Sequence, residues 1–177
     1  MILFGYLGEF QEWQGIERLI EAAKLVMDQR FLLLIVGGSE SRQEGQVVVV
    51  PSVSRERVPY YYSLCDFLVL PRPDHPATQI AAPTKFAEYA AMGKPILTTE
   101  VGDAARFVRK YECGMVLKDN RPGVLAEGMA SMMRITADKQ LTLAAASRSM
   151  AEREFDRRIA ADNLEQCIDD FIARRKR

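Results

Sequence analysis

The fold can be deduced from residues 66–99, which read DFLVLPRPDHPATQIAAPTKFAEYAAMGKPILTT. The apolar runs at 66–71 and 95–99 are short and continuous, which is typical of strands buried on both faces of a parallel sheet. A helix is expected over 84–92 between them, because Gly93 can cap a helix and the proline at 95 prevents its continuation. The segment therefore predicts a β-α-β unit.

The same alternation of strands and helices extends along the chain. Further apolar runs lie at 2–8, 31–37, 47–53 and 113–117. Apolar residues at helical spacing occur within 16–28, 58–65, 124–133, 137–150 and 153–174. The pattern predicts an α/β fold: a single doubly wound, Rossmann-like domain over residues 1–177, with a mostly parallel six-stranded sheet and C-terminal helices.

Charge and hydropathy exclude two classes of partner. The 24 Lys and Arg residues balance the 24 Asp and Glu residues, so no overall field attracts nucleic acid. No apolar stretch reaches the length of a membrane span, and no signal peptide is recognisable at the N-terminus. We expect a cytoplasmic protein with no integral membrane segment, whose terminal RRKR at 174–177 is solvated.

The cysteines and the single histidine argue against a metal site. Cys65, Cys113 and Cys167 are widely separated within apolar stretches, which predicts reduced thiols in the core. Metal ligation is not expected, because no two cysteines have ligand spacing and His75 is the only histidine. His75 is interpreted as a surface polar residue rather than a base. No serine or cysteine with a histidine partner is evident, so no catalytic residue is predicted.

Ligands of a parallel sheet bind where loops follow the carboxyl ends of the strands. Pro83 precedes the helix at 84–92, so the amides of Thr84 and Lys85 are expected to face this edge with the positive end of the helix dipole. Glu88 lies one turn later on the same face and could accept hydrogen bonds from two hydroxyls. The alternative is a carboxylate that only stabilises the helix start. After the first strand, Gly8 would let the backbone approach a ligand.

The order of these segments resembles a known family. DFLVLP, PTKFAEYAAMGKPILTT, VGDAARFV and CGMVL, with the opening YLGEFQEWQGIERLIEAAKLV, resemble the C-terminal, nucleotide-sugar-binding domain of retaining GT-B glycosyltransferases of group one. The resemblance covers nearly the whole chain. It implies one half of a GT-B fold, which takes a nucleotide-diphosphate sugar as donor substrate and uses no metal or other cofactor.

The resemblance also implies a role for each binding residue. Glu88 would bind the ribose hydroxyls, and the amides around Thr84 and Lys85 would bind the diphosphate. Gly37 and Gly38 would let the base approach, the backbone near Ser52 and Val53 would read its edge, and Gly8 would leave room for the phosphates and the sugar. The implied reaction transfers the sugar to a glycan or lipid-linked acceptor, as in polysaccharide biosynthesis.

Several positions depart from the family pattern, and one departure is that Ala104 and Ala105 stand where an acidic residue is usual after the Gly102 loop. Ile80 stands where the first of two acidic residues is usual, and Glu9 and Gln14 stand where an arginine and a lysine are common. These departures keep a second interpretation open, a degenerate non-catalytic domain that binds a nucleotide or a protein. A sugar-nucleotide epimerase or a phosphorylase of the same architecture fits the opening segment less well.

GT-B enzymes consist of two such domains, and the resemblance covers only the second. The N-terminal, acceptor-binding domain is expected to lie outside this chain and to be its partner in the intact protein. The isolated chain is therefore expected to be inactive. The intact protein would be either free in the cytoplasm or bound peripherally to the inner face of the membrane. The helix at 153–174 would either pack on this half or expose its apolar stripe.

Overall fold

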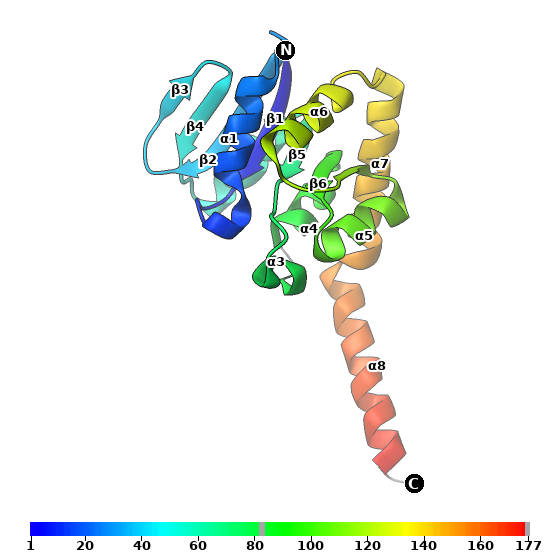
Figure 1. Ribbon diagram of the computed structural model, residues 1–177. Helices are drawn as coiled ribbons and strands as arrows, with labels where there is room; N and C mark the ends of the chain where they lie inside the picture. Colours follow the sequence, from blue (N-terminus) through cyan, green and yellow to red (C-terminus); the bar gives the residue numbers. More distant parts are fainter. Residues whose placement is uncertain (82–83, 176–177) are drawn as a thin grey trace.

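A computed structural model describes residues 1–81 and 84–175, and its central feature is one sheet (Figure 1). Within the described residues the sheet has seven strands in the order β3-β4-β2-β1-β5-β6-β7. The strands are β1 (Ile2–Leu7), β2 (Phe31–Gly38), β3 (Arg42–Glu44), β4 (Val47–Pro51), β5 (Phe67–Leu70), β6 (Ile96–Thr99) and β7 (Gly114–Leu117). All neighbouring strands are parallel except β3 and β4. The predicted α/β fold with a mostly parallel sheet is confirmed.

The predicted number of six strands is wrong, because β3 was not expected. Its residues Arg42, Gln43 and Glu44 are all exposed and pair antiparallel with β4 at the edge of the sheet. Gly45, with φ +57°, makes the turn between the two strands. A polar edge strand of this kind carries no apolar run, so hydropathy alone does not reveal it.

Helices cover both faces of the sheet (Figure 1). They are α1 (Ile16–Leu25), α2 (Val58–Leu64), α3 (Pro76–Ile80), α4 (Thr84–Ala91), α5 (Gly102–Tyr111), α6 (Pro122–Met132), α7 (Ala137–Glu154) and α8 (Arg157–Arg175). Buried residues of α1 and α6 belong to one apolar core, and those of α2, α4, α5 and α7 belong to another. A sheet with a core on each face is doubly wound, as predicted, and its strands are apolar on both sides for this reason.

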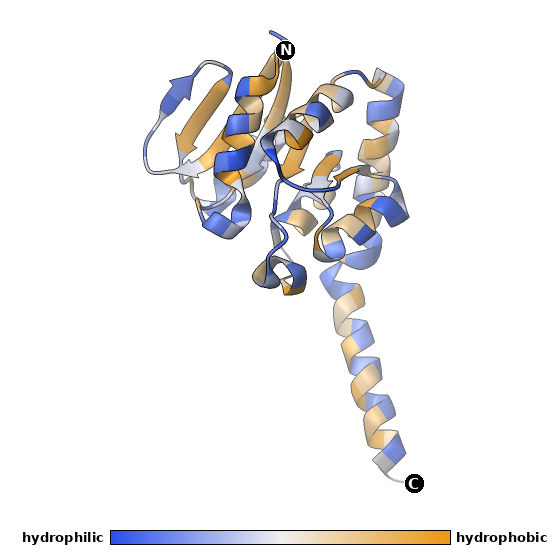
Figure 2. Cartoon of the chain, viewed as in Figure 1, coloured by the Kyte–Doolittle hydropathy of each residue, from blue (hydrophilic) through white to orange (hydrophobic). Residues whose placement is uncertain are grey.

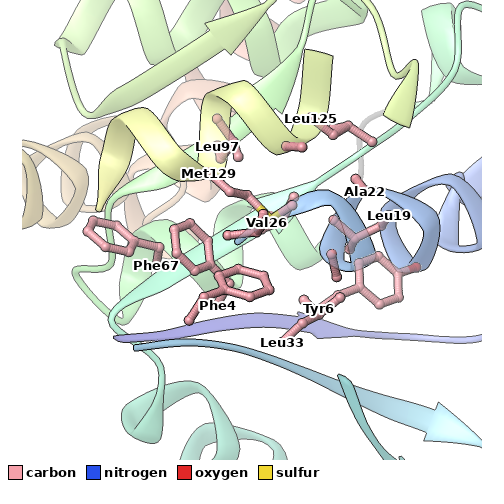
Figure 3. Packing of buried hydrophobic residues seen from close by; sticks show 14 of the residues in the cluster. Phe4, Tyr6, Leu19, Ala22, Val26, Leu33, Phe67, Leu97, Leu125 and Met129 are labelled. Carbon is pink, nitrogen blue, oxygen red and sulfur yellow. The ribbon is translucent and has the colours of Figure 1, made fainter. Parts of the chain in front are cut away.

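The first core is built around aromatic rings that are tilted against one another (Figure 3). Phe4 of β1 contacts Phe31 and Phe67 with ring centroids 5.4 Å and 4.9 Å apart. Leu125 and Met129 of α6 close this core from the helix side. In the second core, Phe86 of α4 packs against Phe107 and Phe155, with centroids 6.2 Å and 5.9 Å apart. The two cores thus hold in place the strand ends that carry the site residues.

The C-terminal helix differs from the rest of the molecule. Helix α8 extends away from the sheet with apolar residues along its length (Figures 1 and 2), and every side chain from 157 to 174 is exposed. The apolar stripe is therefore exposed, the second of the two expected outcomes. Cys167 is exposed as well, so its prediction as a core thiol is wrong, whereas Cys65 and Cys113 are buried, and all three are free.

Candidate functional site

A cavity of about 560 Å³ lies at the carboxyl edge of the sheet, between the ends of β1 and β2 and the start of α4. Its walls include Gly8, Gly37, Ser52, Val53, Thr84, Lys85 and Glu88. These are the residues that the sequence singled out for ligand binding, with one exception. Gly38 lines a neighbouring hollow of about 480 Å³, which shares Gly37 and Ser52 with the first. The predicted binding residues other than Gly38 thus converge on one cavity from the loops at the ends of β1, β2 and β4 and from the first turns of α4.

Two of these loops are in contact, and only glycine fits their geometry. Gly8 has φ +150°, and a Cβ atom there would stand 2.4 Å from Lys85 Nζ. Gly37 has φ +133°, and its Cβ atom would stand 2.1 Å from the carbonyl oxygen of Gly8. A side chain at Gly37 would collide with the backbone of Gly8, a side chain at Gly8 would displace the Lys85 ammonium, and either residue would have a strained backbone conformation. The glycines therefore bring bare backbone to the cavity wall.

Glu88 is held by a tyrosine that the sequence analysis missed as a site residue. The Tyr62 hydroxyl donates a hydrogen bond of 2.7 Å to Glu88 Oε2. Burial, with a further contribution from Glu88, raises the pKa of Tyr62, so the hydroxyl stays a donor. The Tyr62 ring meets the Tyr89 ring edge-on at 5.3 Å. One oxygen of Glu88 is thus fixed, and no other hydrogen bond to its carboxylate occurs in 1–81 and 84–175.

Lys85 is a recessed cation with neutral partners. Its ammonium donates to the Tyr6 hydroxyl at 2.7 Å and to Gln14 Oε1 at 3.1 Å. It also lies 4.5 Å from the centre of the Tyr6 ring. Burial, assisted by the nearby charge of Arg72, lowers the pKa of Lys85 to about 8. No carboxylate of the described residues lies within ion-pair distance of Lys85, so its charge is available to an anion.

The positions that depart from the family pattern have distinct surroundings. Glu9 lines the cavity. Gln14, which stands where the family usually has a lysine, accepts a hydrogen bond from Lys85 of α4. Ile80, at the end of α3, is 88% exposed and carries no polar group. The cavity is thus less positive at the loop after β1 than the family pattern implies.

The loop between β5 and α4 contains the short helix α3, whose start is capped by His75. His75 Nδ1 accepts a hydrogen bond of 3.1 Å from the Ala77 amide, and the His75 amide donates to Thr78 Oγ1 at 3.1 Å. This reciprocal arrangement is a capping box. The imidazole therefore caps the start of α3, and His75 is exposed at the surface, as predicted. The predicted role of Pro83 at the start of α4 lies outside the described residues.

Among the residues that the structure describes, no group of three or more His, Cys, Asp or Glu side chains could hold a metal ion. In the same part of the chain, no helix is both long and apolar enough to span a bilayer.

A parallel sheet with helices on both faces and a cavity at its carboxyl edge is the architecture of nucleotide-binding α/β domains. The sequence model of the family "Glycosyl transferases group 1" matches residues 2–134. The chain therefore belongs to the group 1 glycosyl transferases.

Relatives agree with this assignment. The chain is similar to the Bacillus subtilis (strain 168) protein "Putative teichuronic acid biosynthesis glycosyltransferase TuaH", with 26% identity over 117 residues, 62% of this chain and 30% of that protein. The structure is similar to Anabaena Alr3699/HepE in complex with UDP, with a TM-score of 0.80 and 17% identity over 96% of this chain and 49% of that chain. It is also similar to the C-terminal domain of the group 1 family protein LpcC from Francisella tularensis, with a TM-score of 0.71 and 12% identity over 88% of this chain and 86% of that chain.

At these identities the solved structures establish the fold, which is one Rossmann-like half of GT-B. The chain spans 30% of the length of the curated relative and 49% of the Anabaena chain.

Proposed function

We propose that the cavity binds a nucleoside-diphosphate sugar and that this chain is the donor-binding domain of a retaining glycosyltransferase. The observation that carries the proposal is the convergence of Gly8, Gly37, Lys85 and Glu88 on one cavity at the carboxyl edge of the sheet. The UDP in the similar Anabaena structure supports a nucleotide ligand. The acceptor, a glycan or a lipid-linked glycan, is held by an N-terminal domain outside this chain, at or near the inner face of the membrane. The similarity to the teichuronic acid biosynthesis protein supports an acceptor of this kind.

The donor is recognised at three places. The carboxylate of Glu88, oriented by Tyr62, accepts hydrogen bonds from the ribose hydroxyls. The backbone at Gly37, Ser52 and Val53 faces the base, where the absence of a side chain at Gly37 allows close approach. The phosphates lie between Gly8, which follows β1, and the start of α4. There the helix dipole and Lys85 offer positive charge.

Catalysis then consists of stabilising the departing diphosphate. Fixed positive groups act most strongly where charge develops in the transition state, and a recessed ammonium such as Lys85 needs no reorganisation to do so. The acceptor attacks on the face that the diphosphate leaves, and a phosphate oxygen takes the acceptor proton. No side chain of this chain acts as the base, and no metal or other cofactor takes part.

Titration calorimetry of the 177-residue chain with UDP, GDP and ADP, and with their common sugar conjugates, tests the proposal. One diphosphate is expected to bind, and Glu88→Ala should weaken it by about 1.5 to 3 kcal/mol, the usual contribution of a charged hydrogen bond. Tyr62→Phe should weaken it less, because the carboxylate remains but loses its orientation. Glu165→Ala, a change of the same charge on the exposed surface of α8, is the matched control and should have no effect.

Binding of no diphosphate at millimolar concentration, or equal affinity of the Glu88→Ala variant, would contradict the donor site. A single preferred diphosphate would in addition identify the base.

A non-catalytic nucleotide- or protein-binding module is the second candidate, favoured by Glu9 in the cavity wall and by the exposed Ile80. Glu9 opposes a diphosphate, and Ile80 offers the sugar no hydrogen bond. A transfer assay on the protein that includes the acceptor domain separates the candidates. A catalytic protein releases nucleoside diphosphate only when acceptor is present, whereas a binding module stays silent with every donor.

A further inference from the structure

Arg72 is a buried arginine whose charge has no counter-charge. Arg72 is 4% exposed, and its Nη1 donates a hydrogen bond of 3.1 Å to the carbonyl of Ala81. Its Nε has no hydrogen-bond partner among the described residues, and no described carboxylate forms an ion pair with it. Burying an unpaired charge is costly, so a protein that retains one needs another reason for it.

Three other arginines of the chain each have a carboxylate partner close to them in the sequence. Arg30, Arg121 and Arg158 each form an exposed ion pair with the aspartate two positions earlier, at 2.7 Å, 3.0 Å and 2.9 Å. Arg72 has no acidic residue two positions before it, since Leu70 stands there. It therefore differs from these arginines in both burial and partner.

The loop that contains Arg72 packs beside the residues that hold Lys85: a Cβ atom at Gly15 would stand 2.1 Å from the carbonyl oxygen of Pro71, and the neighbouring Gln14 accepts a hydrogen bond from Lys85. Arg72 lies two residues after the end of β5, at the carboxyl edge of the sheet, and its carbonyl accepts a hydrogen bond of 2.6 Å from Thr99 Oγ1 at the end of β6. Its charge acts on the two groups that lie beneath Gly8. Burial raises the pKa of Tyr6 and Arg72 opposes this rise, while Arg72 adds to the effect of burial in lowering the pKa of Lys85.

The recess therefore contains two positive charges that no ion pair of the described residues neutralises. The positive charge of Arg72 repels that of Lys85 and adds to the effect of burial on the pKa of Lys85. Glu9 and Glu88 act on Lys85 from the cavity side, but neither forms an ion pair with it. The loop after β1 supplies no cation, since Glu9 and Gln14 occupy it. An anion at this point would relieve the repulsion between the two cations.

We propose that Arg72 and Lys85 together form a recessed anion site that holds the diphosphate of the donor, with Arg72 supplying the second positive charge. The inference rests on the proposed donor-binding function and assigns to the loop after β5 a charge that the loop after β1 lacks. Arginine suits this role, because its guanidinium keeps its charge when buried and matches the geometry of phosphate oxygens.

The test compares diphosphates with monophosphates. Calorimetry of the 177-residue chain with UDP, GDP and ADP, and with UMP, GMP and AMP, gives the affinity ratio for the base that binds. Arg72→Gln should lower diphosphate affinity about 10-fold or more, and monophosphate affinity less, so that the ratio falls. Arg72→Lys should retain part of the ratio. Arg30→Gln, which removes the same charge from an exposed ion pair, should leave it unchanged.

Thermal unfolding without ligand separates binding from structure. Removing an unpaired buried charge should leave the Tm of Arg72→Gln unchanged or raised. A lowered Tm with an unchanged affinity ratio would assign Arg72 to anchoring Ala81 and overturn the proposal. Should Arg72→Gln not fold, inorganic pyrophosphate tests the unmodified chain. It should raise the Tm and compete with the nucleoside diphosphate, and failure of both contradicts the anion site.

The outcomes distinguish this inference from the proposed function. If Glu88→Ala abolishes nucleotide binding while Arg72→Gln leaves the ratio intact, the donor site stands and the anion site falls. If no nucleotide binds but pyrophosphate stabilises the chain in an Arg72-dependent way, the anion site stands and the donor site falls.

Discussion

Helices α4 and α8 show how differently one chain uses apolar residues at helical spacing. The eight-residue α4 buries Phe86, Tyr89 and Ala90 against the sheet and turns Lys85 and Glu88 toward the cavity. The nineteen-residue α8 exposes every side chain from 157 to 174. Spacing therefore predicts that a segment is helical, whereas burial depends on whether another element covers its apolar face. Short α4 is anchored because β5, α5 and α7 contact its apolar face.

The largest expected effect is on the buried face of α4. Phe86→Ala removes a side chain that is 3% exposed and in contact with two other phenylalanine rings, so we expect a loss of about 3 to 5 kcal/mol in the free energy of unfolding. Urea denaturation measures it. Phe86→Leu, which leaves a smaller cavity, is the control and should lose less. Equal stability of Phe86→Ala and the unmodified chain would mean that α4 is not anchored in this way.

An intermediate effect is expected on the cavity side of α4. The pKa of Lys85 in the folded chain is lowered to about 8 from an ordinary value of 10.5, so the folded state disfavours its charge. Below pH 8 this penalty is fully present, and between pH 8 and 10.5 it disappears, because the folded lysine has lost its proton while the unfolded one still binds it. Stability relative to Lys85→Met should therefore rise with pH over this interval.

At pH 7 we expect Lys85→Met to be more stable than the unmodified chain by on the order of 1 to 3 kcal/mol. Denaturation of both proteins at several pH values, with no ligand present, measures the difference. The idea fails if the difference is independent of pH. Lys139→Met, at an exposed position near the start of α7, is the control and should show no such dependence.

The smallest effect is expected on α8. Leu164 is 63% exposed, and alanine is at least as good a helix former, so Leu164→Ala should change the free energy of unfolding by less than about 0.5 kcal/mol. Chemical denaturation of the two chains provides the measurement. A loss comparable to that of Phe86→Ala would show that α8 packs against the body in solution, and the contrast between the two helices would disappear.

Much of the site could be predicted because parallel strands place their following loops at one edge of the sheet. Gly8, Gly37 and Lys85 are far apart in sequence, yet each follows or faces a strand end, and one cavity collects them. Glycine loops and the start of a helix can be predicted from residue type alone. Their assigned roles in binding remain predictions that the calorimetry tests.

Other features depend on tertiary contacts and leave no local pattern. Tyr62 looks like any apolar position of α2 until its hydroxyl meets Glu88 from another helix. Arg72 stands in a proline-rich loop where an arginine is usually solvated, and only the packed structure reveals its burial. The exposure of Cys167 follows from the position of α8, which apolar spacing does not specify. The fold was thus easier to predict than the electrostatics of the site.

The polar strand β3 has a consequence for the behaviour of the protein at high concentration. Beside it, β4 carries four consecutive valines, and an uncovered strand of this composition is a template for aggregation through its free backbone groups. β3 pairs with those groups and turns Arg42, Gln43 and Glu44 outward, while Glu44 forms a 2.6 Å ion pair with Lys24 of α1. A short charged strand at this edge is a poor surface for further pairing, so β3 protects the sheet from growing into a neighbouring molecule.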